Sequence, residues 1–355
     1  MMKVLIAMSG GVDSSVAAKL LCDEGCECIG CTMKLYDNCD AGLPRGRTCC
    51  SLDDVEDARS VAFSLGMRYY VFNFKDDFRE KVIKKFASGY LRGQTPNPCI
   101  DCNRYMKFDK LFERAKLLGC DKIATGHYAR IEFDGEKYRL KKALDKSKDQ
   151  SYVLYMLTQE QLAHTLFPLG SLHKTDTRAI ADAADLSSAR KPDSQDICFV
   201  PDGDYAAAIE RLTGEKAPCG DFIDASGKIL GTHRGITHYT VGQHRGLGLS
   251  LPERRYVCGI DAESGTVTLG GSDELYSSTA EVRDFNWISG EAPSEPIRCT
   301  AKIRYRQPEQ PATAIARSDG SVTLHFDAPQ RAVTPGQAAV LYDGNTVLGG
   351  GEIVR

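Results

Sequence analysis

The chain has 355 residues, of which 42% are hydrophobic and 26% are charged, so it can bury more than one core and is not disordered in composition. Its net charge of −3 does not indicate a nucleic-acid-binding chain, so any RNA contact must rest on local clusters of positive charge. The apolar run Val4–Met8 is too short for a signal peptide or a membrane span, so we expect a cytoplasmic protein with no membrane partner.

The first part of the chain alternates β-branched or aromatic runs with helical patterns, which is typical of a parallel α/β sheet. Strands are expected over Lys3–Met8, Glu27–Met33, Tyr69–Phe74 and Lys122–Thr125. Helices are expected over Asp13–Glu24, Leu52–Leu65, Asp77–Arg92 and Tyr105–Leu118, the first of them ending at Gly25.

The pattern changes after Pro201, where the chain becomes Gly-rich with short strand patterns. From about residue 273, period-two alternation dominates, with strands expected over Thr300–Tyr305, Ser321–Phe326 and Ala338–Leu341. We therefore predict an α/β domain over residues 1–205 and two small, mainly β domains over residues 206–272 and 273–355. On the first of these strands, Lys302, Arg304 and Arg306 flank Tyr305 and offer cations and a stacking surface to a nucleic acid, unless this is simply a solvated edge strand.

The first strand runs directly into a Gly-rich turn that opens a helix, Met8-Ser9-Gly10-Gly11-Val12-Asp13-Ser14-Ser15. Two glycines let successive N–H groups point into one concavity, the helix N-terminus adds its positive dipole end, and Ser9, Ser14 and Ser15 add hydroxyls. No lysine follows as in a Walker A loop, so the site is expected to hold pyrophosphate. The alternative, a Gly turn with an ordinary helix cap, is less favoured because strand, motif and helix stand in the expected order. The motif resembles the PP-loop of the ATP pyrophosphatase superfamily, whose members cleave ATP to AMP and pyrophosphate while adenylating a substrate.

The chain contains 14 cysteines, which in a reducing compartment indicates metal binding, catalysis or use in the core rather than a disulfide framework. Cys28 and Cys31 lie three apart in a predicted strand and face opposite ways, so we interpret them as core residues. Cys22, Cys26 and Cys120 receive the same interpretation. The role of three cysteines in the loop after the second strand is left open: Cys39, Cys49 and Cys50.

Three further cysteines lie in polar surroundings. Cys99 and Cys102 follow Thr95-Pro96-Asn97-Pro98, which predicts a turn on which two thiols can converge. Cys198 lies in the polar stretch Asp193–Phe199, where the alternative is a small buried hydrophobe.

Motifs spread along nearly the whole chain together resemble the bacterial tRNA-specific 2-thiouridylases, the MnmA family. The motifs are Ser9–Ser15, Thr95–Asn103, Ala124–Tyr128, Lys148–Tyr152, Asp196–Phe199, Gly242–Gly248, Lys302–Arg306 and Thr334–Gln337. The resemblance implies an N-terminal PP-loop domain of the adenine nucleotide alpha hydrolase type, a small central β-rich domain and a C-terminal β-barrel, which together grip tRNA. It also implies ATP with Mg²⁺, a tRNA anticodon loop with its wobble uridine as substrate, and an upstream sulfur donor or sulfur-relay protein.

The resemblance assigns candidate roles to individual residues. It implies ATP contacts at Ala7, Met8, Ser9, Gly10, Gly11, Val12, Asp13, Ser14, Met33 and Gly126. Cys102 matches the family's nucleophile and Cys198 its persulfide-carrying cysteine. It implies contacts to tRNA at Asn97 and Pro98, which match positions touching the target base, and at His127, Lys148, Asp149, Gln150, Arg304, Tyr305 and Gln337.

The sulfur step has two interpretations, because many family members carry aspartate where this chain has Cys99. The favoured one is a persulfide on Cys198, which delivers sulfur directly or after attack by Cys102. In the other, Cys99, Cys102 and Cys198 hold three irons of a [4Fe–4S] cluster whose fourth iron binds hydrosulfide. The predicted reaction is adenylation of the uridine C2 oxygen followed by its replacement with sulfur. The alternatives are another PP-loop tRNA thiolase, an adenylating ligase or a non-catalytic RNA-binding module.

Overall fold

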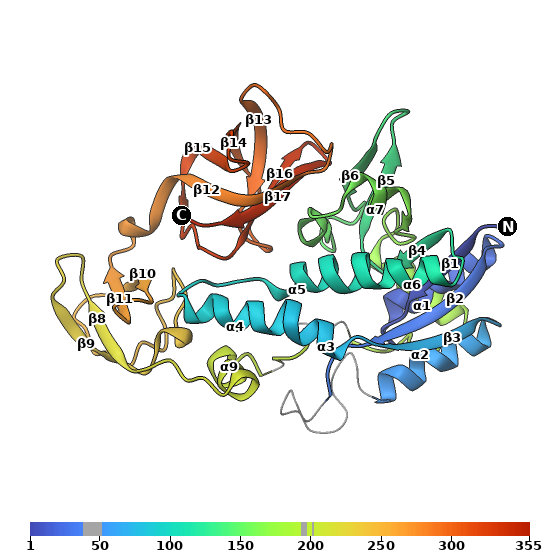
Figure 1. Ribbon diagram of the computed structural model, residues 1–355, viewed down its shortest axis with the longest axis horizontal. Coiled ribbons are helices and arrows are strands. Elements are labelled where there is room, and N and C mark those ends of the chain that lie inside the picture. The colour runs from blue at the N-terminus through green and yellow to red at the C-terminus, as the bar shows by residue number, and fades with distance from the viewer. Residues whose placement is uncertain (38–51, 193–196, 201) are drawn as a thin grey trace.

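The computed structural model describes residues 1–37, 52–192, 197–200 and 202–355. The open question about Cys39, Cys49 and Cys50, and the start of the polar stretch before Cys198, therefore lie outside the described residues. Figure 1 shows an N-terminal α/β domain, a small β domain beside the long helices and a barrel above them. This arrangement confirms the expected fold class.

The N-terminal domain is built on a five-stranded sheet in the order β3-β2-β1-β4-β7, in which all neighbours are parallel. Its strands are β1 (Lys3–Ala7), β2 (Glu27–Lys34), β3 (Arg68–Asn73), β4 (Lys122–Thr125) and β7 (Thr165–Leu166). The first four confirm the predicted strands to within one or two residues. The short strand β7 was not predicted, because two residues carry no periodicity.

Helices cover both faces of this sheet. On one face, Val4 and Ile6 of β1 pack with α1 (Val12–Asp23), α2 (Leu52–Ser64) and α8 (Lys174–Ala183). On the other face, Leu5 packs with the helical run that ends in α6 (Leu111–Leu117). Cys28 belongs to the first core and Cys31 to the second, which confirms that this pair fills the interior.

Two long helical runs lie side by side at the centre of Figure 1. One comprises α3 (Lys75–Phe78), the π-helix η1 (Arg79–Ile83) and α4 (Lys84–Leu91). The other comprises α5 (Pro98–Asp101), the π-helix η2 (Cys102–Lys110) and α6.

The second run starts earlier than predicted, so the interpretation of Cys99 and Cys102 as turn residues was wrong. The side chain of Asn97 caps the helix by accepting the Cys99 N–H at 3.1 Å. Pro98 occupies the first helical position, where its missing N–H costs no hydrogen bond. The two thiols are therefore three residues apart on a helix, a spacing that places them on neighbouring positions of one side.

The central domain begins with a helix that the Gly-rich pattern did not predict, α9 (Tyr205–Thr213), whose first residue is the predicted boundary residue 205. Ala208 and Ile209 of α9 pack with Phe86 of α4, so the helix belongs to a core shared with the N-terminal domain. A four-stranded sheet follows in the order β10-β11-β8-β9. Its strands are β8 (Gly220–Ile223), β9 (Ile229–His233), β10 (Tyr256–Asp261) and β11 (Thr266–Gly270), and the 3₁₀ helix η4 spans Ile236–His238.

The C-terminal domain is a barrel that closes through pairing of its first and last strands, β12 and β17. After the 3₁₀ helix η5 (Asp273–Leu275), its strands are β12 (Tyr276–Trp287), β13 (Ile297–Lys302), β14 (Gln310–Ala316), β15 (Val322–Arg331), β16 (Ala338–Asp343) and β17 (Thr346–Ile353). The strand predicted over Thr300–Tyr305 ends at Lys302, because the chain then turns and the Gln307 N–H donates to the carbonyl of Arg304. Arg304, Tyr305 and Arg306 thus lie on a turn rather than on one strand.

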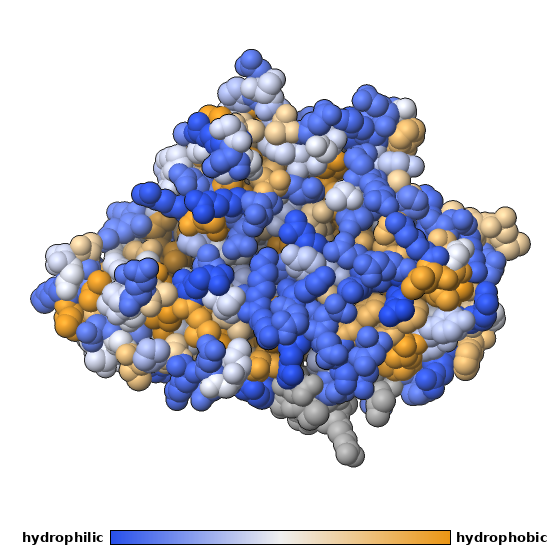
Figure 2. All heavy atoms as spheres, viewed as in Figure 1, coloured by the Kyte–Doolittle hydropathy of each residue, from blue (hydrophilic) through white to orange (hydrophobic). Residues whose placement is uncertain are grey.

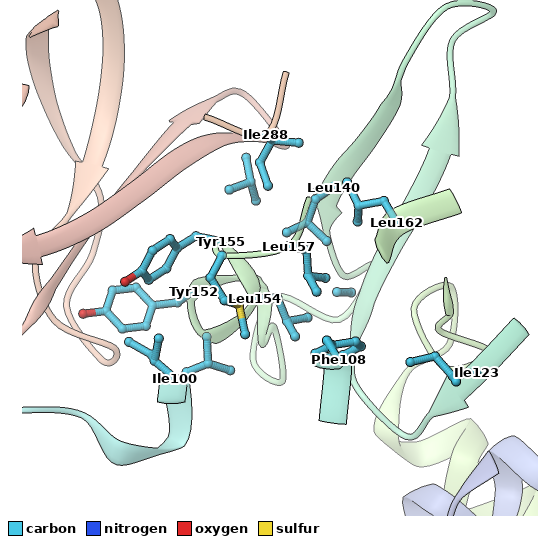
Figure 3. Close-up of a cluster of buried hydrophobic side chains, with 14 of the residues drawn as sticks. Ile100, Phe108, Ile123, Leu140, Tyr152, Leu154, Tyr155, Leu157, Leu162 and Ile288 are labelled. Atoms are coloured by element: carbon cyan, nitrogen blue, oxygen red, sulfur yellow. The ribbon is translucent and has the colours of Figure 1, made fainter. Parts of the chain in front are cut away.

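A hairpin of the N-terminal domain joins the barrel. Its strands are β5 (Ala129–Phe133) and β6 (Tyr138–Lys142), and Lys141 of β6 pairs with Thr346 of β17. The next segment contains η3 (Ser151–Leu154) and α7 (Gln159–Ala163). In Figure 3, Tyr152 and Tyr155 of this segment lie between the barrel and Ile100, so one apolar cluster holds the barrel to the N-terminal domain.

The face in Figure 2 is mostly hydrophilic, with separate apolar patches toward the two ends of the molecule. Exposed apolar side chains include Phe63 and Leu117, on the outer helices. No helix in the described ranges is long and apolar enough to cross a membrane.

Candidate active site

The phosphate loop joins β1 to α1 and depends on glycine. Gly10 has a φ of +75°, and a Cβ there would lie 2.4 Å from the backbone oxygen of Asp54. Gly126, directly after β4, has no room for a side chain either, since its Cβ would lie 2.8 Å from the backbone of Asp13 and Ser14. The ends of β1 and β4 therefore meet at the N-terminus of α1, whose leading N–H groups have no partner within the helix.

The serine hydroxyls mainly shape this loop. Ser14 Oγ accepts the Ser9 N–H at 3.1 Å and donates to the Gly11 carbonyl at 3.1 Å. Ser15 Oγ is fully buried, donates to the same carbonyl and accepts the hydroxyl of Ser188. The prediction that all three hydroxyls point to an anion was therefore wrong for Ser15, and only Ser9 is exposed.

Two lysines that the sequence did not point to complete the loop. Lys174 Nζ lies 2.7 and 2.8 Å from the carboxylate oxygens of Asp13, and Tyr128 OH donates to the same carboxylate at 2.9 Å. Lys191 similarly pairs with Asp54, whose backbone backs Gly10, at 2.9 Å. The negative charge of Asp13 is thus balanced at the mouth of an anion site. Lys174 follows the loop by 161 residues, so no local pattern could have identified it.

Cys102 and Cys198 pack against one aromatic core although they are far apart in the chain. This core contains Phe78, Phe86 and Phe199, and both cysteines are half-buried against it. The hydroxyl of Tyr36, just after β2, donates to the Cys198 carbonyl at 2.8 Å and ties the cysteine segment to that strand end. Met33, near the end of β2, packs on the same core. The structure therefore gathers both candidate sulfur-handling residues beside the strand ends that carry the phosphate loop.

Cys99 differs from these two because its residue is exposed. Among the described residues, which include Cys99, Cys102 and Cys198, no group of three or more His, Cys, Asp or Glu residues is placed to hold a metal ion. The iron–sulfur alternative therefore stays a prediction of the sequence, without a preformed ligand group among these described residues.

Three family profiles match successive parts of the chain: a tRNA methyl transferase HUP domain over residues 2–202, a tRNA methyl transferase PRC-barrel domain over 208–271 and an aminomethyltransferase beta-barrel domain over 277–353. The chain is 52% identical to the tRNA-specific 2-thiouridylase MnmA of Acetivibrio thermocellus, over 99% of both chains. It is 51% identical to MnmA 2 of Caldanaerobacter subterraneus and 47% identical to MnmA of Clostridioides difficile, in each case over 99% of this chain and 98% of the relative.

The chain belongs to the tRNA-specific 2-thiouridylase family.

Several residues that the thiouridylase resemblance assigns to tRNA contact lie together beside the hairpin. Tyr305 OH lies 3.5 Å from the Asp149 carbonyl, and Lys302 Nζ is 5.7 Å from the Tyr305 ring centre. Gln150 exchanges hydrogen bonds with the backbone of Tyr128 through its side chain and its N–H, at 3.0 and 2.9 Å. Lys148 precedes them in the same segment. The structure thus brings this set to one seam, between barrel and hairpin.

Two other residues that the resemblance assigns to tRNA contact form hydrogen bonds between domains in the structure. Arg304 Nη2 donates to the carbonyls of Val241 and Ala332 at 3.0 and 3.3 Å and to Thr334 Oγ1 at 2.6 Å, joining the central domain to the barrel. Gln337 Nε2 donates to the Thr95 carbonyl at 2.6 Å, two residues before Asn97. Their contact with tRNA stays a prediction.

His127 is buried rather than presented to solvent. Its Nδ1 lies 2.7 Å from Thr125 Oγ1, and its Nε2 lies 3.4 Å from Lys107 Nζ. Burial, and then the Lys107 charge, hold the pKa of His127 well below its usual value, so the ring is neutral. A contact of this histidine with tRNA also stays a prediction of the thiouridylase resemblance.

Proposed function

We propose that this chain is an ATP-dependent tRNA sulfurtransferase that adenylates the C2 oxygen of a wobble uridine and replaces it with sulfur. The relatives, which it matches over 99% of its length, are named tRNA-specific 2-thiouridylases. We also propose that it acts in the cytoplasm, with domain boundaries at residues 205 and 272 and the tRNA contacts given above.

One observation carries the proposal: the phosphate loop and the two candidate sulfur cysteines lie at the same edge of a parallel sheet. Ligands of such sheets bind beyond the carboxyl ends of the strands, where the strand order reverses. Here the order reverses between β1 and β4, and the loop after β1 and Gly126 after β4 meet at that point. Cys198 is tied to Tyr36 beyond the end of neighbouring β2.

The first chemical step follows from this geometry. The C2 carbonyl of uridine is a poor electrophile, and its oxygen is a poor leaving group. Transfer of AMP from ATP to that oxygen solves both problems, and the departing pyrophosphate meets the N–H groups at the start of α1. Magnesium would arrive with ATP and be bound mainly by phosphate oxygens and water. Lys174 neutralises the Asp13 carboxylate, which would otherwise repel the phosphates.

The second step moves sulfur. Cys198 carries a persulfide, Cys198–S–SH, supplied by an upstream donor. The Cys102 thiolate attacks Cys198 Sγ, which forms a Cys102–Cys198 disulfide and expels hydrosulfide. Hydrosulfide then adds to C2, AMP leaves, and a dithiol reductant restores both cysteines. Because water at C2 would regenerate uridine, the site must exclude it while the adenylated base is present.

Substitution of either cysteine tests the proposal. We expect Cys198→Ser and Cys102→Ser to abolish 2-thiouridine formation while binding ATP and tRNA as the wild type does. Cys219→Ser is the matched control, since Cys219 is an exposed cysteine of the central domain. Full thiolation by Cys198→Ser would contradict the sulfur route.

Nucleoside mass spectrometry on unmodified tRNA, incubated with the protein, ATP and a sulfur donor, tests the activity itself. Exchange of oxygen for sulfur is expected, and this method separates it from an added methyl group. If no thiolated base formed, another adenylating PP-loop activity would replace the proposal.

A further inference from the structure

A partly buried ion cluster includes Asp101, the residue next to the candidate nucleophile. Lys85 Nζ of α4 is 2.9 Å from Asp101 Oδ1 and 3.9 Å from Glu352 Oε2 of barrel strand β17. Asp101 immediately precedes Cys102 and is only 5% exposed. The helices α4 and α5 and the distant barrel strand β17 thus meet through one lysine.

The cluster borders a small polar cavity of about 30 Å³ at the seam between the helices and the barrel. Arg104 and Asp284 also line it, together with Lys85, Asp101 and Glu352. A cavity of this size and polarity has room for water, because one molecule needs about 10–15 Å³ and two to four polar partners. The contact between the helices and the barrel therefore has a polar part, next to the apolar contacts in Figure 3.

The barrel holds the same segment from a second direction. The Thr95 N–H donates to the Pro335 carbonyl at 2.8 Å, and Gln337 donates to the Thr95 carbonyl. A Cβ at Gly336 would lie 2.8 Å from Thr95 N, so the two chains touch. The nucleophile helix, the run of α5 and η2 that contains Cys102, is thus held at its start both by the barrel loop that contains Gly336 and by β17.

The opposite side of this helix carries the reactive group. Asp101 and Arg104 face the cavity, whereas Cys102 packs on the aromatic core with Phe199. The first turn of the helix, which carries Cys102, is thus in contact with β17 through Lys85. The buried carboxylate of Asp101 is costly unless it is paired, so loss of Lys85 should disturb this contact.

We infer that Lys85, Asp101 and Glu352 form a clamp that positions Cys102, so that occupation of the barrel by tRNA is coupled to placement of the nucleophile. This inference rests on the proposed function. The three are positioning residues, because none is required to touch the substrate.

The test uses the full chain with Glu352→Gln and Lys85→Met, and Lys85→Arg as the conservative variant. We expect tRNA affinity within about twofold of the wild type and a single-turnover thiolation rate at least about tenfold lower, since a misplacement of ~1 Å costs about a hundredfold. Lys85→Arg should restore most of the rate. Glu80→Gln is the matched control, because Glu80 pairs with Lys84 in the same helical run but in solvent.

Alkylation of Cys102 by iodoacetamide, resolved by peptide mass spectrometry, gives a readout independent of turnover. We expect tRNA to change this rate in the wild type and in Glu80→Gln, and to change it little in Glu352→Gln. Folded clamp variants with wild-type thiolation and alkylation rates would overturn the clamp. If the wild type binds tRNA but forms no 2-thiouridine, the proposed function fails, while the alkylation rates still decide whether the clamp positions Cys102.

Discussion

Gly10 and Gly25 provide a matched pair that isolates packing strain in the phosphate loop. The two have nearly the same left-handed backbone, with φ of +75° and +79°. Around Gly25, no described atom lies within 4 Å of an added Cβ, whereas at Gly10 the nearest is the Asp54 backbone oxygen at 2.4 Å. Replacing each glycine by alanine therefore adds the same backbone cost but a clash only at Gly10.

The expected losses differ by the cost of that clash. A left-handed conformation costs a non-glycine residue about 1–2 kcal/mol, so Gly25→Ala should lower the free energy of unfolding by about that amount. Forcing a methyl group into a filled space costs a further ~1–3 kcal/mol, so Gly10→Ala should lose about 2–5 kcal/mol. Because Asp54 presents backbone rather than a flexible side chain, the loop itself must shift.

Urea unfolding followed by circular dichroism measures the two losses, and calorimetry measures ATP binding. We expect Gly10→Ala to weaken ATP binding strongly and Gly25→Ala to leave it unchanged, since Gly25 lies at the far end of α1. Equal losses of stability in the two variants, or unimpaired ATP binding by Gly10→Ala, would refute the reasoning.

Three further predictions concern charged or titratable groups. Arg304→Met should lower stability by about 2–3 kcal/mol and speed proteolysis between the central domain and the barrel, because it removes charged donors from three acceptors. In the wild type, the unfolded chain binds a proton at His127 below pH 6.5 and the folded chain does not, so stability falls by up to about 1.4 kcal/mol for each pH unit of acidification. His127→Gln removes this group and should therefore flatten the pH dependence of stability. Urea unfolding midpoints measured across this pH range would show the difference. Lys174→Met should weaken ATP binding about tenfold or more by calorimetry, because the Asp13 carboxylate loses its counter-charge.

Each of these has a control and a contradicting outcome. Arg306→Met changes an exposed neighbour of Arg304, and an equal loss of stability there would contradict the role of the Arg304 hydrogen bonds in joining the two domains. Lys19→Met removes an ion pair with Asp23 at the other end of α1, and should leave ATP binding intact. If the pH dependence of the His127 variant matched that of the wild type, His127 would not be held neutral by burial.

The sequence predicted what depends on local pattern. The apolar run of β1, the glycines of the loop and the stop at Gly25 follow one another in a single short stretch of chain, so their order was sufficient to predict strand, phosphate loop and helix. The start of the nucleophile helix was missed because prolines usually mark turns, whereas Pro98 at a first helical position supports a helix capped by Asn97.

Contacts between residues far apart in the chain could not be predicted from local sequence patterns. Lys174 reaches Asp13 only after the sheet has formed, and no spacing rule relates them. Arginine is a common residue type at RNA contacts, but in the structure the Arg304 side chain donates to backbone carbonyls of two domains.

The pairing of β6 with β17 has a consequence for how the protein is made. Lys142 donates through its side chain to the Gly344 carbonyl, 202 residues later in the chain. As the polypeptide leaves the ribosome, the β5–β6 hairpin emerges long before its partner strand, and its outer edge waits unpaired. The same late strand also closes the barrel against β12. A chain interrupted before Thr346 would leave two strand edges open at once, and such edges invite pairing with other polypeptides and aggregation.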